Sequence, residues 1–162
     1  MMCKLPDYYM PKHFKAHEFL PPWEFDRWGV AGLRYFMDVR VLVTADNIRT
    51  FFGAPCTINN WWWKRKANKP ECEWRQWSGY RPDRYYESVV LNAGDPVPSM
   101  SQHRFGRAVD MLIAGVTATQ ARDIIMNHQQ LFPWIRRIED DVAWLHFDVC
   151  GDHHHGIHLF HP

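Results

Sequence analysis

The segment AVDMLI, residues 108–113, is short and apolar apart from one aspartate, and turn-forming residues bound it on both sides. Its length and boundaries favour a buried strand. Burying Asp110 there is costly unless the carboxylate has a cation or hydrogen-bond donors beside it. His103 lies seven residues earlier in the chain. The two residues either hold a metal ion together or lie near one another in an ordinary loop and strand.

Two helices are predicted from apolar periodicity and end signals. The first covers about residues 38–52, with Asp38 as its N-cap and Gly53 as its C-cap. The second begins after Thr117, which has Gln120 at capping-box spacing.

The remaining pattern predicts strands and loops. Residues 134–149 alternate on either side of an acidic trio and indicate a β-hairpin. The other segments are expected to be a strand near residues 56–61, loops over 64–76 and 84–100, an irregular start before residue 38, and a closing strand in GIHLF. The fold class predicted is α+β: a small, mostly antiparallel sheet with flanking helices, in a single domain over residues 1–162.

Composition narrows the classes of partner. The 162 residues are 46% hydrophobic, which suits one sizeable core. The formal net charge is +1, so the chain as a whole does not attract nucleic acid or an anionic membrane electrostatically. Charges interrupt the N-terminal segment, and no later segment approaches a span of roughly 18 apolar residues, so we expect a soluble chain without a signal peptide. WWWKRK, residues 61–66, could clamp a single strand of nucleic acid, but tryptophans more often close a core edge or line a ligand groove. We expect a monomer with no nucleic-acid or membrane partner.

The second strand of the hairpin has two distinct faces. Because side chains alternate along a strand, one face is apolar and carries Leu145, Phe147 and Val149. The other face carries Trp144, His146 and Asp148. If this polar face lies beside the strand of Asp110, His146 becomes a third ligand. Two imidazoles and one carboxylate, with a fourth position open to water, form the ligand set of a catalytic zinc site. A surface histidine and an aspartate bonded to a backbone amide stay open as the alternative.

Three segments resemble the M15 family of zinc peptidoglycan peptidases, which includes D-alanyl-D-alanine carboxypeptidases and L-alanyl-D-glutamate endopeptidases. SQHRFGRAVD is similar to the family signature SxHxxGxAxD, WLHFD to its second metal segment, and SGYR to the stretch that supplies an arginine. The fixed positions of the signature are occupied by Ser101, His103, Gly106, Ala108 and Asp110. The resemblance covers about residues 57–149.

The resemblance implies the M15 (Hedgehog-like) fold and a Zn²⁺ ion held by His103, Asp110 and His146. It implies a peptidoglycan stem peptide as substrate. It also implies action in the periplasm or cell wall, after release by a phage holin or within a virion. Arg81 of SGYR suits a terminal carboxylate or the oxyanion of a tetrahedral intermediate, because its guanidinium presents a fork of donors. A solvent-facing Arg81 that stabilises the turn is the alternative.

The sequence departs from the family pattern at the position of the general base. Many M15 members carry Glu, Asp or His two or three residues before the last metal histidine, where this chain has Trp144 and Ala143. If residues 140–143 form a hairpin loop, Glu139 lies opposite Trp144 and diagonal to the metal histidine. Glu139 is therefore the predicted base. Asp148 is the next choice, unless it orients the histidine or anchors the strand, and Asp141 is a third candidate.

Loss of the usual base position leaves a second hypothesis open. The same fold could serve as a catalytically inactive zinc-binding structural or recognition module.

Overall fold

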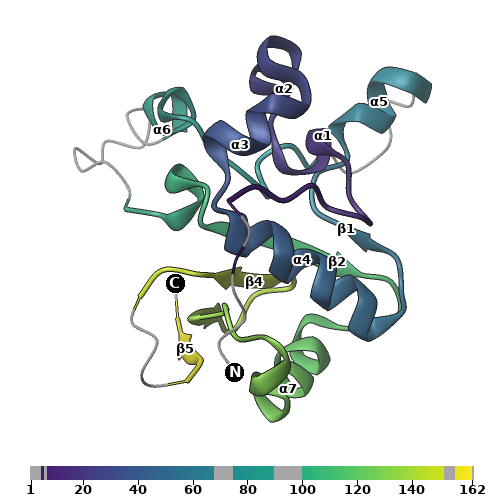
Figure 1. Ribbon diagram of the computed structural model, residues 1–162, viewed down its shortest axis with the longest axis vertical. Coiled ribbons are helices and arrows are strands. Elements are labelled where there is room, and N and C mark those ends of the chain that lie inside the picture. The colour runs from purple at the N-terminus through teal and green to yellow at the C-terminus, as the bar shows by residue number, and fades with distance from the viewer. Residues whose placement is uncertain (1–4, 6, 68–74, 90–99, 152–155, 162) are drawn as a thin grey trace.

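The computed structural model describes residues 5, 7–67, 75–89, 100–151 and 156–161 (Figure 1). In chain order the elements are α1 Ala16–Phe19, α2 Pro22–Trp28, the 3-10 helix η1 Gly29–Ala31, α3 Gly32–Phe36, α4 Val39–Phe52, β1 Cys56–Thr57, α5 Trp61–Ala67, α6 Asp83–Val89, the 3-10 helix η3 Gln102–Phe105, β2 Ala108–Ile113, α7 Ala118–Asn127, the 3-10 helix η4 Gln129–Leu131, β3 Arg137–Glu139, β4 Leu145–Asp148 and β5 His158–Phe160. Over the described part of the chain, none of the helices combines the length and apolar character that crossing a membrane requires.

The strands form one mixed sheet in the order β1-β2-β4-β3-β5. Neighbouring strands run antiparallel, except that β3 and β5 are parallel. The predicted strand over residues 108–113 is confirmed at both ends as β2, and the hairpin and the closing strand are also confirmed. The α+β class with flanking helices is therefore correct.

The core lies between the sheet and helices α4 and α7. Val109 of β2 and Phe147 of β4 are paired across the strands and fully buried, and Ile48 of α4 belongs to the same buried cluster. Figure 1 shows α4 crossing the sheet and α7 below it, and both helices contact β2. Because side chains alternate, Asp110 and His146 point to the opposite face of these strands.

Both long helices begin at the predicted capping residues. The carboxylate of Asp38 accepts the N–H of Arg40 at the start of α4, and Gly53 ends this helix with a φ of 61°. The hydroxyl of Thr117 accepts the N–H of Gln120, whose side chain accepts the Thr117 N–H in return. Local signals thus define both starts.

The irregular start predicted before α4 is wrong, because α1, α2 and α3 occupy much of it. These helices are at most seven residues long, too short for a clear apolar period. Pro22 stands at the first position of α2, where its missing N–H costs nothing. Burial of Phe19 and Leu33 at 0% exposure shows that tertiary packing stabilises this region.

The strand predicted near residues 56–61 is wrong beyond Thr57. Trp61 instead begins α5, so the first part of the predicted 64–76 loop is also helical, and residues 68–74 lie outside the described residues. The Trp61 ring is 2% exposed, and its indole N–H donates to the carbonyl oxygen of Leu20 at 3.0 Å. Docking of this ring onto the N-terminal helices overrides the strand pattern.

The loop predicted over residues 84–100 is wrong at its start, where α6 runs from Asp83 to Val89. Pro82 before the helix and Asp83 in its first turn are start signals that the sequence does contain. Residues 90–99 of that loop lie outside the described residues.

Candidate metal centre

Three side chains from separate parts of the chain meet on the polar face of the sheet. His103 comes from η3, Asp110 from the middle of β2 and His146 from β4. Asp110 and His146 are paired directly across the strands. The three residues are 1%, 5% and 7% exposed, respectively. The structure therefore brings the three predicted ligands together.

The distances between the ligand atoms suit one small cation. Asp110 Oδ1 lies 3.2 Å from His103 Nε2 and 2.7 Å from His146 Nδ1, and the two nitrogens are 3.3 Å apart. Ligands about 2.0–2.1 Å from a tetrahedral zinc ion are separated by about 3.3 Å. Two edges of the observed triangle match this separation, and the edge between Asp110 and His146 is shorter.

The tautomer of His103 gives an independent test of this fit. Its Nδ1 lies 2.7 Å from the carbonyl oxygen of Gly79, which can only accept, so Nδ1 carries the hydrogen. In the neutral ring, Nε2 then directs a lone pair at the carboxylate oxygen of Asp110. Two acceptors 3.2 Å apart repel unless a cation lies between them. This residue set therefore fits a divalent metal ion.

The electrostatics favour the same protonation states. Burial lowers the pKa of His103 below its ordinary value, against the opposing attraction of the Asp110 carboxylate. Burial by itself would raise the pKa of Asp110, but the adjacent imidazoles of His103 and His146 hold it well below its usual range. A neutral imidazole and an ionised carboxylate are the forms that bind metal.

The lowered pKa of His103 predicts acid destabilisation of the metal-free protein. Below the ordinary value of 6.5, the unfolded chain binds a proton that the folded state excludes. The free energy of unfolding should therefore fall with decreasing pH, by up to about 1.4 kcal/mol per pH unit between pH 6.5 and the folded-state pKa. Above about pH 5, Asp110 is ionised in both states and adds no slope. Urea unfolding in the presence of a chelator measures the effect, and an equal slope in His103→Gln would contradict its assignment.

Two glycines allow the backbone segments to converge here. Gly106 follows η3 with a φ of 62°, and a Cβ on it would lie 1.7 Å from the carbonyl oxygen of Phe36. A Cβ on Gly79 would lie 2.1 Å from the carbonyl oxygen of Phe19. The N-terminal helices therefore press directly on the two loops that position His103.

Arg81 lies beside the metal ligands and holds one of them. Its Nη2 donates to Asp110 Oδ2 at 2.8 Å, and its Nε donates to the carbonyl oxygen of Trp77 at 2.5 Å. The guanidinium also lies 5.5 Å from the centre of the Tyr85 ring. The side chain remains 21% exposed and lines the pocket described below. Arg81 therefore orients Asp110 and still has an exposed edge.

Glu139 lies closer to His146 than the sequence predicted. The predicted four-residue loop set Glu139 opposite Trp144, and this register is wrong. The structure pairs Ile138 with Phe147, and the next step along both strands places Glu139 opposite His146. Glu139 Oε2 lies 3.6 Å from His146 Nδ1, and its side chain is 15% exposed.

A buried arginine of α7 explains this register. Arg122 Nη1 donates to the carbonyl oxygens of Val142 at 3.0 Å and Trp144 at 3.4 Å, and its Nε lies 3.1 Å from Asp140 Oδ1. Backbone groups bound in this way do not extend the β3–β4 ladder. Residues 140–144 therefore form the connection between Glu139 and the metal-binding strand.

Arg122→Met is expected to destabilise the fold by about 3 kcal/mol, because it leaves carbonyl oxygens of this connection without their donor. Urea unfolding of the variant measures the loss. Arg104→Met is the matched control: Arg104 binds Asp83, whose side chain is 69% exposed, so removing this surface pair should cost less than about 1 kcal/mol. Equal losses in the two variants would show that Arg122 does not hold the connection.

Asp148 is buried and fully engaged. Its side chain is 0% exposed, and its Oδ2 accepts from Arg137 Nε at 2.9 Å and contacts Arg137 Nη2 at 2.7 Å. Its Oδ1 accepts the N–H of Cys150 at 3.0 Å. Of the roles expected for Asp148, this geometry favours anchoring the strand over accepting a proton.

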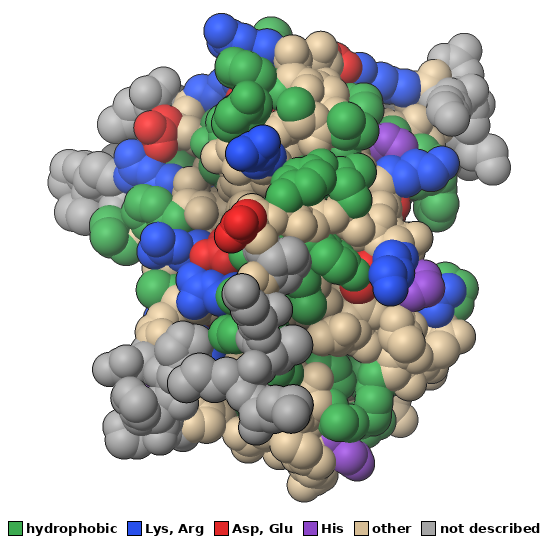
Figure 2. Space-filling view, in the orientation of Figure 1, with side chains coloured by type: hydrophobic (Ala, Val, Ile, Leu, Met, Phe, Trp, Pro, Cys, Tyr) green, Lys and Arg blue, Asp and Glu red, His purple; other side chains and the backbone are tan. Residues whose placement is uncertain are grey.

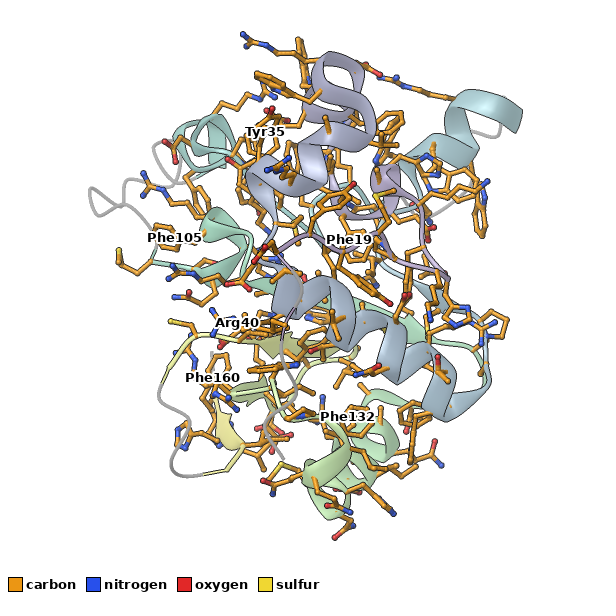
Figure 3. The ribbon with its side chains drawn as sticks, viewed as in Figure 1. Phe19, Tyr35, Arg40, Phe105, Phe132 and Phe160 are labelled. Atoms are coloured by element: carbon orange, nitrogen blue, oxygen red, sulfur yellow. The ribbon has the colours of Figure 1, made fainter. Side chains whose placement is uncertain are left out.

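An open pocket of about 420 Å³ leads to the metal ligands and Glu139. Its wall also contains Arg137, Trp144 and Phe160, which were not predicted as site residues. Phe160, labelled in Figure 3, comes from β5 and meets the His146 ring edge to face at 5.8 Å. Arg137 could have been found from the sequence, because it precedes Glu139 by two residues on one strand face. Phe160 depends on the parallel pairing of β5 with β3, for which the sequence has no local signal.

The tryptophans of WWWKRK do not share one surface. Trp61 is buried, and the indole N–H of Trp62 donates to the carbonyl oxygen of Asn59 at 3.2 Å. Trp63 is 47% exposed. The first two rings are thus engaged with the protein itself.

Comparison of the chain with protein-family models, with curated proteins and with solved structures found no match.

Proposed function

We propose that the protein is a zinc-dependent peptidase that hydrolyses a peptide bond in the stem peptide of peptidoglycan, as a carboxypeptidase or an endopeptidase. One observation carries the proposal: His103, Asp110 and His146 meet at an open pocket with the Glu139 carboxylate beside them. Catalytic zinc sites have three protein ligands and an open position, whereas structural sites are closed by four.

The substrate class follows from the resemblance of SQHRFGRAVD, SGYR and WLHFD to the M15 peptidases. The same resemblance favours action at the cell wall, which a phage product would reach through holin release or within a virion.

Glu139 is the proposed general base. When bound, zinc supplies the Lewis acidity that makes water a nucleophile at neutral pH. The Glu139 carboxylate accepts the proton of the attacking water and passes it to the leaving amine nitrogen. The side chain lines the pocket while its strand is held by β4 and β5, so the carboxylate is fixed next to the reacting groups.

Arg81 and Asp148 have supporting roles in this proposal. Arg81 fixes the Asp110 carboxylate and presents its exposed edge to a terminal carboxylate or to the developing oxyanion. Asp148 holds Arg137 at the pocket wall, where the guanidinium adds a second positive charge.

Incubation of the zinc-loaded protein with purified muropeptides tests the proposal. Release of D-alanine or cleavage of the stem peptide, suppressed by a chelator and restored by zinc, is the expected result. Zinc uptake without turnover of any stem peptide would overturn the peptidase and favour the zinc-binding module.

A further inference from the structure

A second hollow lies on the helical part of the molecule. Its volume is about 630 Å³, and its wall contains the rings of Trp23, Trp28 and Phe36. Trp23 is 67% exposed and Trp28 is 40% exposed. Figure 2 shows hydrophobic side chains interspersed with charged ones over the region of α2 and α3. Large exposed rings gathered at one hollow are typical of a ligand-binding surface.

Neighbouring side chains hold these rings in place. The guanidinium of Arg84 lies 5.0 Å from the centre of the Trp23 ring, and that of Arg27 lies 5.2 Å from the centre of the Trp28 ring. Tyr35, labelled in Figure 3, meets Trp28 edge to face at 5.3 Å. Because the rings are already ordered, a ligand that stacks on them loses little affinity to side-chain ordering.

Polar side chains at the same hollow offer hydrogen bonds to a ligand. Asp26 and Arg84 both line it, and their side chains are 52% and 45% exposed. The carboxylate of Asp26 can accept from a ligand hydroxyl or amide N–H, and the guanidinium of Arg84 can donate to a ligand oxygen.

The charges around the hollow limit the class of ligand. Among the lining side chains, Glu24 and Asp26 contribute two carboxylates and Arg27 and Arg84 two guanidiniums, and Arg65 beside Asp26 adds one more positive charge, so neither sign is in strong excess. A chain of phosphates or a nucleic acid requires a strongly positive surface. An aliphatic chain would cover the exposed Asp26 and Arg84 side chains without forming hydrogen bonds to them. A neutral sugar meets both conditions, since its C–H face packs on an indole ring while its hydroxyl and N-acetyl groups supply hydrogen-bond donors.

We propose that this hollow binds the glycan strand of the cell wall, a neutral chain rich in N-acetylated sugars. The choice of this glycan rests on the proposed peptidase function. The inference that the aromatic hollow binds a sugar does not depend on that function. Phe36 stacks on Tyr80 with ring centres 4.9 Å apart, and Tyr80 directly precedes Arg81 of the metal centre. Arg84 follows Arg81 by three residues, a backbone span of at most about 10 Å. One segment thus connects the glycan site to the peptidase site, as a substrate with peptides attached to a glycan requires.

Calorimetric titration with chitotetraose, a β-1,4-linked tetramer of N-acetylglucosamine, tests the proposal without requiring turnover. The wild-type protein should bind the tetramer, and Trp23→Ala and Trp28→Ala should each weaken binding at least tenfold. Trp63→Ala is the matched control, because Trp63 is an exposed tryptophan on α5 that does not line the hollow. No binding by the wild type, or equal affinity in Trp23→Ala and Trp63→Ala, would overturn the proposal.

The same variants separate this proposal from the peptidase proposal. Trp23→Ala should keep the wild-type kcat/KM on a short soluble stem peptide and should lose at least tenfold in rate on intact cell walls. If the protein cleaves no peptide, the titration still measures glycan binding. If Trp23→Ala cleaves intact walls at the wild-type rate, the hollow does not bind the substrate glycan.

Discussion

Glu139→Gln is expected to lower kcat on a stem peptide by about 10²- to 10⁴-fold while the protein keeps its zinc. The glutamine has the same size but cannot accept a proton from water. The three ligand atoms do not include Glu139, so the affinity for zinc should change little. Single-turnover cleavage of a labelled stem peptide, together with zinc analysis of the same sample, measures both quantities.

Asp141→Asn is the matched control for this loss. Asp141 belongs to the same acidic trio and is the third candidate for the base, but its side chain is 79% exposed, lies 3.2 Å from His161 and does not line the pocket at the metal ligands. This variant should retain wild-type kcat. If Asp141→Asn loses activity and Glu139→Gln does not, the base is assigned to the wrong residue.

Gly106→Ala is expected to destabilise the fold by about 4 kcal/mol or more, the largest effect of any single substitution predicted for stability. Its φ of 62° strains any residue with a Cβ, and the Cβ would also meet the carbonyl oxygen of Phe36 at 1.7 Å. The Phe36 backbone cannot easily move away, because the N–H of Asp38 donates to the Gly106 carbonyl oxygen at 3.0 Å. Chemical unfolding of the variant measures the loss.

Gly53→Ala separates backbone strain from the clash. Gly53 has nearly the same φ, 61°, but a Cβ there would have no atom within 4 Å. Strain by itself should therefore cost about 1 kcal/mol. Similar losses at the two glycines would contradict the close approach of the N-terminal helices to the metal-binding loop.

The parts of the fold predicted correctly have local signals. The capping residues Asp38 and Thr117 define the starts of α4 and α7, and the apolar run of β2 has turn residues at both ends. The short helices α1 to α3 lack such a period. They exist because rings such as Phe19 and Trp61 are buried among them, a tertiary effect that no local pattern contains.

The same distinction between local and tertiary causes applies to the residues of the site. The ligands His103, Asp110 and His146 could be predicted because a spaced motif and strand alternation put them on one face. The position of Glu139 could not, because it depends on how Arg122 holds the connection between β3 and β4. The engagement of Asp148 by Arg137 likewise depends on the pairing register that follows.

Zinc stoichiometry tests the central claim, that three distant side chains hold one divalent cation, most directly. Competition with a chromophoric chelator should give one tightly bound zinc per chain in the wild type. The control variant His13→Asn should bind zinc equally well, because the His13 imidazole lies 3.1 Å from Thr50 Oγ1 and is not one of the three ligands. His103→Asn and His146→Asn should each lose that tight binding while circular dichroism shows a folded protein. Undiminished tight zinc binding in both of these variants would contradict the metal centre, and the proposed peptidase with it.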